Sequence, residues 1–405
     1  MSAASSLENV LILQGGGSLG AFGCGVFKAL AHNDVKLDIV AGTSIGGVNA
    51  AIIAGSKDDK YPEKVLEQFW LELAEASKAL DSFSSSSLPP TYSPSFSQWL
   101  ATAEKFSSFV SQYNSNVPDN NLKVKSILSA YGSAVYGNDK FFKPRWMPEY
   151  VLADPEYSIP AEWTYIYDHS PLVKTLEKYI DYNRLKPTGG NSDTRLIMTA
   201  VNVLTAQPLT FDSYKQQITP KHILATSGYP LYAFPWIEVE SGVYAWDGGL
   251  LSNTPLREVI DASPVKDKQV FLVENYPKNI VKLPNNLAEV YHRARDIMFS
   301  DKTELNITLS KVISMYLSYI DEMYHVIEEF VDMNKADKKR IEKIRLKYKK
   351  YKKERGAEIK KIWHITRDEP FPFIYENADF SLDAIKSSIK DGEQKTNQIL
   401  EKQSH

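Results

Sequence analysis

The pattern of apolar and polar positions in residues 8–55 alternates strand with helix. Residues 10–13 form a continuous apolar run ended by glycines, which is typical of a strand buried on both faces, and residues 37–41 repeat this pattern. After Ser18, a residue type that caps helices, apolar positions fall at helical spacing, and residues 48–54 predict a second helix. This order predicts parallel strands whose two glycine-rich turns open side by side at their carboxyl ends.

Later stretches continue the same pattern. Strands are predicted at residues 195–203, 207–212 and 269–274, and a helix of small residues at 223–228. A further apolar stretch runs into Asp247-Gly248-Gly249, where the aspartate alone would be an ordinary turn residue. The chain is therefore predicted to be an α/β protein with a mainly parallel central sheet flanked by helices.

Gly42-Thr43-Ser44-Ile45-Gly46 lies between a predicted strand and a predicted helix, which is the context that gives a G-x-S-x-G pattern its meaning. A sharp turn there raises the serine hydroxyl above the sheet, provided that the flanking positions carry no bulky side chains. The glycines at 42, 46 and 47 meet this need. Ser44 is therefore a candidate nucleophile rather than an ordinary helix cap.

Gly15, Gly16 and Gly17 allow three interpretations. The spacing to Gly20 fits a dinucleotide fingerprint, but that site needs an acidic residue at the end of the second strand, and Asp38 lies at its beginning. A phosphate-binding P-loop fails because no Gly-Lys-Ser/Thr follows. The third interpretation is an oxyanion hole made of backbone N–H groups at a helix N-terminus. Close helix packing explains Gly20 but not three consecutive glycines.

Composition and charge argue against a nucleic-acid-binding, a disulfide-bonded or a membrane-spanning protein. The 405 residues are 43% hydrophobic and 12% aromatic, enough for a sizeable core, and the net charge of -3 gives the chain no nucleic-acid character. The single Cys24 excludes an intramolecular disulfide and fits a reducing compartment. The first residues lack a signal-peptide pattern, and no apolar run approaches the ~18 residues of a membrane span. We therefore expect a cytoplasmic protein; the sequence leaves its oligomeric state open.

Together these motifs resemble the patatin-like phospholipase family. The family's Gly-Gly-Gly-x-x-Gly, Gly-x-Ser-x-Gly and Asp-Gly-Gly patterns match Gly15 to Gly20, Gly42 to Gly46 and Asp247 to Gly249, in the same order. Residues 141–145 and the segment around Asp247 are most similar to a bacterial subgroup with a C-terminal extension. Many members carry Arg or Lys where this chain has Leu19, so a phosphate contact from that position is absent.

The resemblance implies a three-layer sandwich that hydrolyses carboxylic esters of lipids through an acyl-enzyme intermediate. Ser44 would be the nucleophile and Asp247 the base, with an oxyanion hole from Gly15, Gly16 and Gly17. The turn around the nucleophile would use Gly42, Thr43, Ile45 and Gly46, supported by Gly20, Gly248 and Gly249. Two alternatives stay open: an acyltransferase that uses the same site, and a catalytically silent lipid-binding or scaffold protein.

Neither a metal, a cofactor nor a histidine is expected to take part. None of the seven histidines lies in a strand-end motif, and no ligand set has metal-binding spacing. The base must then be Asp247 alone. We expect desolvation to make this carboxylate a stronger base than it is in water.

Two regions lie outside the motif-bearing core. The core is expected at residues 8–280, with an insertion at about 80–160 that begins with a Ser/Pro-rich loop at 82–97 and is rich in aromatic residues. These aromatic residues predict either a lid or acyl-chain pocket, or a satellite cluster under a long loop. Residues 281–405 are expected to form a helical, basic extension.

The basic stretch at residues 335–361 contains 14 basic and 4 acidic residues, a local charge of +10. Such a run is usually a solvated helix face. Because Ile341, Ile344, Tyr348 and Tyr351 fall on one helical stripe, adsorption to an anionic membrane is the alternative. A strand at 361–366 and a final helix at 381–400, opened by Ser381, are predicted to follow.

Overall fold

The computed structural model describes residues 7–77, 118–147, 150, 163–187, 194–300, 302–330, 338–355, 357–369 and 376–402. The expected Ser/Pro-rich loop at 82–97 and the first aromatic residues of the insertion lie outside these ranges. Within the described residues, no helix combines the length and the apolar character that crossing a bilayer would require.

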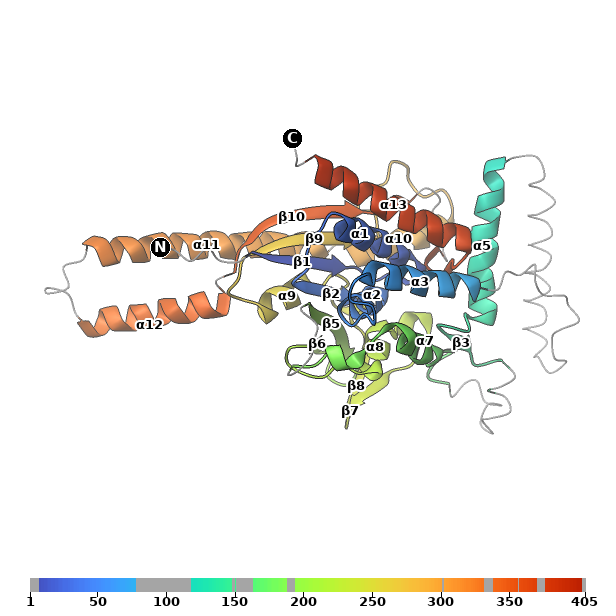
Figure 1. Cartoon of the computed structure of the whole chain (residues 1–405), viewed down its shortest axis with the longest axis horizontal. Coiled ribbons are helices and arrows are strands. Elements are labelled where there is room, and N and C mark those ends of the chain that lie inside the picture. Colours follow the sequence, from blue (N-terminus) through green and yellow to red (C-terminus); the bar gives the residue numbers. More distant parts are fainter. Residues whose placement is uncertain are drawn as a thin grey trace, which may run out of the picture.

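One eight-stranded sheet forms the centre of the protein (Figure 1). The strand order is β10-β9-β1-β2-β5-β8-β7, and β6 also pairs with β5. Neighbours from β10 to β5 are parallel, whereas β6, β7 and β8 run antiparallel to their partners. The predicted α/β fold with a mainly parallel sheet is therefore confirmed. The strands are β1 (Glu8–Leu13), β2 (Ile39–Thr43), β5 (Arg195–Asn202), β6 (Pro208–Asp212), β7 (Ile237–Glu240), β8 (Val243–Asp247), β9 (Lys268–Glu274) and β10 (Ile359–Thr366).

Helices cover both faces of this sheet, because its central strands carry apolar side chains on each face. Leu11 and Leu13 belong to a large core under one helical layer, and Val10 and Ile12 belong to a second core under the other. The first layer contains α1 (Ala21–His32), α2 (Ile45–Ala54), α3 (Pro62–Glu75), α7 (Pro171–Tyr179), α8 (Pro220–Ser227) and α13 (Leu382–Glu401). The second contains α9 (Leu256–Ala262) and the start of α11 (Lys302–Phe330), and α10 (Leu287–Ser300) lies between β9 and α11 in sequence.

The first helix begins later than its pattern predicted. Ser18 does not cap it: this residue lies in a 3-10 turn, η1 (Gly17–Gly20), and its hydroxyl donates to the carbonyl oxygen of Glu376 at 3.0 Å. The α-helix starts at Ala21. A contact with a segment more than 350 residues away thus replaces the local cap that was expected.

The chain after residue 280 contributes a strand and a helix to the body of the protein, and it also forms a helical hairpin that extends from the body. The predicted strand at 361–366 is β10, and it pairs with β9 as the edge strand of the central sheet. Helix α13 packs along α1, where a β-carbon at Gly25 or Gly392 would overlap the backbone of the opposite helix. These two elements close the body, so residues 281–405 are not simply an appended helical unit.

The projection is a hairpin of α11 and α12 (Lys338–Arg355), which extend side by side from the body (Figure 1). Tyr324 stacks on Tyr348 with ring centroids 4.1 Å apart, and an ion pair joins Arg345 to Glu328 at 3.1 Å. The remaining elements are α5 (Pro118–Tyr136), the ribbon of β3 (Lys143–Pro144) and β4 (Tyr167–Asp168), and the 3-10 turns η6 (Tyr182–Arg184), η7 (Pro230–Tyr232), η8 (Gly248–Leu250) and η9 (Glu376–Ala378).

Candidate active site

Ser44 occupies a sharp turn between β2 and α2. Its backbone has φ 58° and ψ -132°, a strained conformation for a residue with a side chain. The turn closes so tightly that a β-carbon at Gly42 would overlap the carbonyl of Gly46, and one at Gly46 would overlap the carbonyl of Leu13. Glycine is therefore required at both positions, as the sequence pattern predicted.

Three threonines hold this turn in place. The Ser44 N–H donates to Thr226 Oγ1 at 3.2 Å, and the Thr226 hydroxyl in turn donates to the carbonyl oxygen of Thr199 at 2.6 Å. The hydroxyls of Thr43 and Thr199 share a hydrogen bond of 2.6 Å. All three threonines are buried, so these bonds fix the backbone of Ser44 against β5 and α8.

Sheet register brings Asp247 close to this turn. Thr43 at the end of β2 lies opposite Thr199 of β5, and the next residue of β5, Ala200, lies opposite Asp247 at the end of β8. Because β8 runs antiparallel, it enters the sheet from beyond the carboxyl end of β5 and stops beside Ser44. A β-carbon at Gly248 would overlap the carbonyl and hydroxyl of Thr199, which explains why the turn after Asp247 begins with glycine.

The Asp247 carboxyl is fully buried. Its Oδ1 accepts a hydrogen bond of 2.7 Å from the Gly249 N–H, whereas Oδ2 has no partner of normal geometry among the described residues. Burial raises the pKa of Asp247 to about 7, and the hydroxyl of Ser44 and the amide of Gly249 act in the opposite direction. This carboxyl therefore exchanges its proton near neutral pH.

In the glycine loop, residues 15–17, carbonyl groups accept hydrogen bonds while the backbone N–H groups stay unpaired among the residues that the structure describes. Asn275 Nδ2 donates to the carbonyl oxygens of Gln14 at 3.0 Å and Gly15 at 3.1 Å, and the Gly16 carbonyl accepts from the N–H of Leu19. Within the described part of the chain, the N–H groups of residues 15–17 donate to no other group. The φ values of Gly16 (149°) and Gly17 (59°) allow this arrangement.

These features meet at one cavity of about 320 Å³. Of the residues predicted from sequence, six line it: Gly16, Gly17, Ser44, Ile45, Asp247 and Gly249. Gly15 lies beside them, since a β-carbon there would be 2.8 Å from Cβ of Ser44. The other predicted residues do not line the cavity but pack the turns around it: Gly20, Gly42, Thr43, Gly46 and Gly248.

Nine aromatic residues line the cavity, and they come from segments that the motifs do not mark. Phe141 and Phe142 belong to the predicted insertion, where a pocket was one of two interpretations. Sequence reasoning missed the other walls, which include Tyr229, Phe234, Tyr276, Phe299, Asn377 and Phe380. No local pattern marks these residues, because distant elements bring them together.

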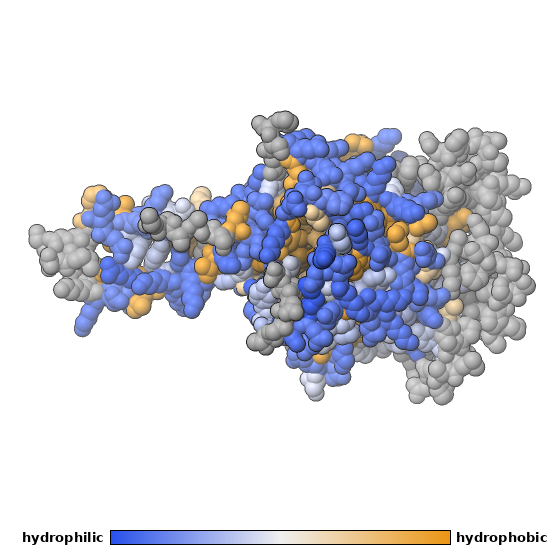
Figure 2. Space-filling view, in the orientation of Figure 1, coloured by the Kyte–Doolittle hydropathy of each residue, from blue (hydrophilic) through white to orange (hydrophobic). Residues whose placement is uncertain are grey.

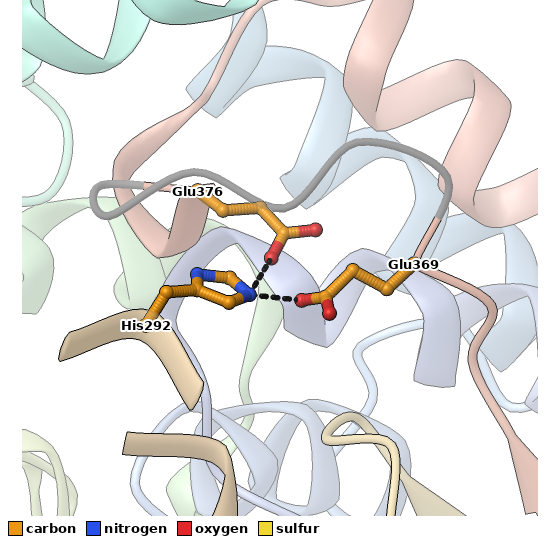
Figure 3. Close-up of side chains that lie close together, drawn as sticks. All are labelled: His292, Glu369 and Glu376. Atoms are coloured by element: carbon orange, nitrogen blue, oxygen red, sulfur yellow. Dashed lines mark hydrogen bonds and ion pairs between the residues drawn. The ribbon is translucent and has the colours of Figure 1, made fainter. Parts of the chain in front are cut away.

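A buried ionic network holds the segment that contains Asn377. His292 on α10 lies 2.5 Å from Glu369 and 4.0 Å from Glu376. Figure 3 shows its imidazole turned toward both carboxylates. Arg367, just after β10, contacts Glu376 at 2.6 Å. The network thus joins α10, β10 and η9, and it fixes η9 over the glycine loop, where a β-carbon at Gly17 would overlap the carbonyl of Asn377.

His292, Glu369 and Glu376 could together offer three metal ligands within 4.8 Å of one another. Their immediate neighbours do not favour a cation, because two guanidinium groups face the same carboxylates. Arg295 lies 3.6 Å from Glu376, and Arg367 lies 3.5 Å from Glu369. Protein cations therefore already balance these negative charges.

A family model for patatin-like phospholipases matches residues 11–260. The chain belongs to the patatin-like phospholipase family. A patatin-like phospholipase domain-containing protein of Coccidioides immitis is 41% identical over 61 residues, which is 15% of this chain and 8% of that protein.

Two solved structures are similar over much of the chain. VipD from Legionella pneumophila is 16% identical with a TM-score of 0.36, covering 99% of this chain and 68% of VipD. ExoU from the type III secretion system of Pseudomonas aeruginosa, solved with SpcU, is 14% identical with a TM-score of 0.25, covering 74% of this chain and 51% of that one. The chain thus spans about half the length of ExoU and 8% of the Coccidioides relative.

Proposed function

We propose that this patatin-like protein is a lipid acyl hydrolase that cleaves carboxylic esters with a Ser44–Asp247 dyad. The observation that carries the proposal is the meeting of three features at one apolar cavity: a serine in a strained turn, a buried carboxyl whose pKa is about 7, and unpaired N–H groups of the glycine loop. Each supplies one requirement of acyl transfer by a serine.

In the first half-reaction, Ser44 Oγ attacks the carbonyl carbon of the ester, and the hydroxyl proton passes to Asp247 Oδ2. The carbonyl π electrons move to oxygen, and the resulting oxyanion accepts hydrogen bonds from the N–H groups of Gly16 and Gly17, with Gly15 adjacent. Collapse of the tetrahedral intermediate breaks the bond to the alcohol oxygen. The departing alcohol takes the proton from Asp247, which leaves an acyl-Ser44 and a carboxylate.

In the second half-reaction, water attacks the acyl-Ser44 carbonyl and gives a proton to Asp247. The new intermediate collapses to a carboxylic acid, and Ser44 Oγ recovers the proton from Asp247. An alcohol in place of water would give transesterification through the same steps, which is the acyltransferase alternative. Product ratios measured with and without added glycerol distinguish the two outcomes.

The cavity wall supports an acyl chain as the bound group. Phe141, Phe142, Phe234 and Phe380 present aromatic surface to it, and the described lining residues include no lysine, arginine or histidine. Leu19 is buried against Tyr229, Tyr276 and Phe299, at the position where many family members carry a basic residue. Recognition therefore rests on the chain of the lipid rather than on a phosphate contact inside the cavity.

Substitution of Ser44 tests the proposal. We expect Ser44→Ala to lower hydrolysis of a medium-chain nitrophenyl ester by several orders of magnitude, and to abolish labelling by a fluorophosphonate. Ser56→Ala, which alters a buried serine just beyond the other end of α2, serves as the matched control and should retain turnover. A chelator should leave wild-type turnover unchanged. Wild-type rates in Ser44→Ala would overturn the nucleophile assignment.

We further propose that α12 attaches the protein to anionic membranes. This helix carries 11 basic and 2 acidic residues, and most of them are exposed. On anionic lipid each such residue can add about 1 kcal/mol, and salt screens the attraction. Lys343→Glu with Lys347→Glu should weaken co-sedimentation with phosphatidylserine vesicles, whereas Lys221→Glu with Lys282→Glu on the body should not. Binding that ignores both salt and anionic lipid would contradict this role.

A further inference from the structure

Helix α11 carries a long apolar stripe that nothing in the described structure covers. Its central members are Leu309, Val312, Tyr316, Tyr319, Met323 and Val326, and it extends by one step at each end to Leu305 and Phe330. These eight side chains are between 39% and 74% exposed. Figure 2 shows apolar residues among the charged ones on this projection. Contiguous exposed apolar area of this extent marks an interaction site.

The spacing of the stripe is that of a coiled-coil seam. From Leu305 to Phe330 the steps alternate four and three residues without a break over the helix. A strict alternation of this kind places apolar side chains at the a and d positions of a heptad and suits a second helix. Ile313 and Ile320, next to the seam, widen the apolar surface and are also exposed.

The seam faces away from α12. Three residues of α11 meet α12: Asp321 pairs with Lys352 at 3.2 Å, Tyr324 stacks on Tyr348, and Glu328 pairs with Arg345. At 3.6 residues per turn they lie on nearly the opposite side of α11 from Tyr319 and Met323. The basic helix and the apolar seam therefore occupy opposite faces of the hairpin.

We propose that the seam of α11 binds the same seam of a second copy of this chain. The exposed area of the eight side chains is roughly 800 Å² per chain, which is what each partner buries in a standard stable interface. A lipid surface fits less well, because the basic helix α12 packs on the other face of α11 from the seam, whereas Glu322 and Glu329 lie on the helix that carries it. A second helix with the same pattern can bury the apolar side chains of the seam along its whole length.

The two copies run antiparallel. The start of α11 is built into the body, where Ile307 is 3% exposed in the second core, so a parallel pair would force two bodies into the same space. In the antiparallel pair the stripe maps onto itself: Val312 meets Met323 of the other copy, Tyr316 meets Tyr319, and Ile313 meets Ile320. The two α12 helices then lie on the outside, free to face a membrane.

The oligomeric state of the full chain tests the pairing. Sedimentation velocity should show a dimer, and Tyr316→Glu with Met323→Glu should raise its dissociation constant at least about 100-fold by burying two charges. Lys311→Glu with Ser318→Glu, on exposed positions of α11 outside the stripe, is the matched control and should stay dimeric. Circular dichroism checks that both variants remain folded.

A wild-type monomer at about 50 μM would overturn the proposal, since a seam of this area should give tighter association. A stripe variant that stays dimeric would overturn it too. The proposal would also be overturned if the wild type were monomeric and bound vesicles while the stripe variant did not bind them. The seam would then be a lipid-binding face.

Cross-linking tests the orientation. Val312→Cys and Met323→Cys chains, mixed under mild oxidation, should form a disulfide with each other, whereas each variant alone should not. The native Cys24 is buried and does not interfere. Disulfides formed within each variant alone, at either position, would show parallel helices and overturn the antiparallel arrangement.

Discussion

Replacement of Asp247 by asparagine should stabilise the fold at alkaline pH while it removes turnover. Burial raises the pKa of this carboxyl from 3.8 to about 7 in the folded protein. A folded-state pKa above the unfolded value means that the native state favours the protonated form. The free energy of unfolding therefore falls as pH rises from about 4 to about 7, and the full loss is present above pH 7.

The size of the effect follows from the shift. At 1.36 kcal/mol per pKa unit, the raised pKa of Asp247 lowers the free energy of unfolding by about 4 kcal/mol at pH 8, and by about 1.5 kcal/mol at pH 5, where the carboxyl is ionised in the unfolded chain only. Asparagine is neutral at both values, and its amide oxygen can still accept from the Gly249 N–H. The stability difference between Asp247→Asn and wild type should therefore grow by about 2.5 kcal/mol from pH 5 to pH 8.

Urea unfolding at several pH values measures this difference. Subtracting the two proteins at each pH cancels the titration of all other groups. Ser56→Ala, a buried substitution that removes no ionisable group, is the matched control and should give a difference that does not change with pH. If the stability difference between Asp247→Asn and wild type is equally flat, the carboxyl titrates normally and the reasoning from burial is wrong.

The same pKa governs catalysis. The proposed base must be ionised to accept the Ser44 proton, so wild-type turnover should rise with pH through about 7 and then level off. Asp247→Asn should abolish turnover at every pH. A rate that is constant from pH 5 to pH 9 would exclude Asp247 as the titrating base.

Two further substitutions test how the turn around Ser44 is held. Thr226→Val removes the acceptor of the Ser44 N–H and the donor to the Thr199 carbonyl, so it should cost about 1–3 kcal/mol of stability and lower kcat with little change in KM; an unchanged kcat would show that this bond does not position Ser44. Gly46→Ala should prevent folding or cost several kcal/mol, because its β-carbon would overlap the Leu13 carbonyl, whereas Gly242→Ala, in open space at φ 77°, should cost about 1 kcal/mol. Thermal melts compare the two, and equal losses would contradict the packing argument.

Much of the sheet could be predicted from sequence because its strands are buried on both faces. The short, continuous apolar runs of β1 and β9 indicate strands that are buried on both faces. The turns that carry Ser44 and Asp247 could also be predicted from sequence, because close backbone contacts require glycine there and the glycines form a recognisable local pattern. Local chemistry thus identified the groups that the structure brings to one cavity.

What the pattern could not reveal is long-range contact. The walls of the cavity come from α10, η9 and the segment after α8, and no periodicity relates them. The Ser18 prediction was wrong for the same reason, because Glu376 competes for its hydroxyl. The edge position of β10 could not be read from its sequence either, since a strand after a long helical hairpin has no local mark of its partner.

The topology couples the projection to the site. The α11–α12 hairpin is inserted between α10 and β10, so α11 starts in the second core and α12 leads directly into the edge strand of the central sheet. Beyond β10, Arg367 and Glu369 belong to the ionic network that fixes η9, and η9 closes over the glycine loop. Helix α13 then packs along α1, the helix that follows this loop. A continuous path of contacts therefore runs from the end of α12 through β10 and η9 to the loop that carries the N–H groups of residues 15–17.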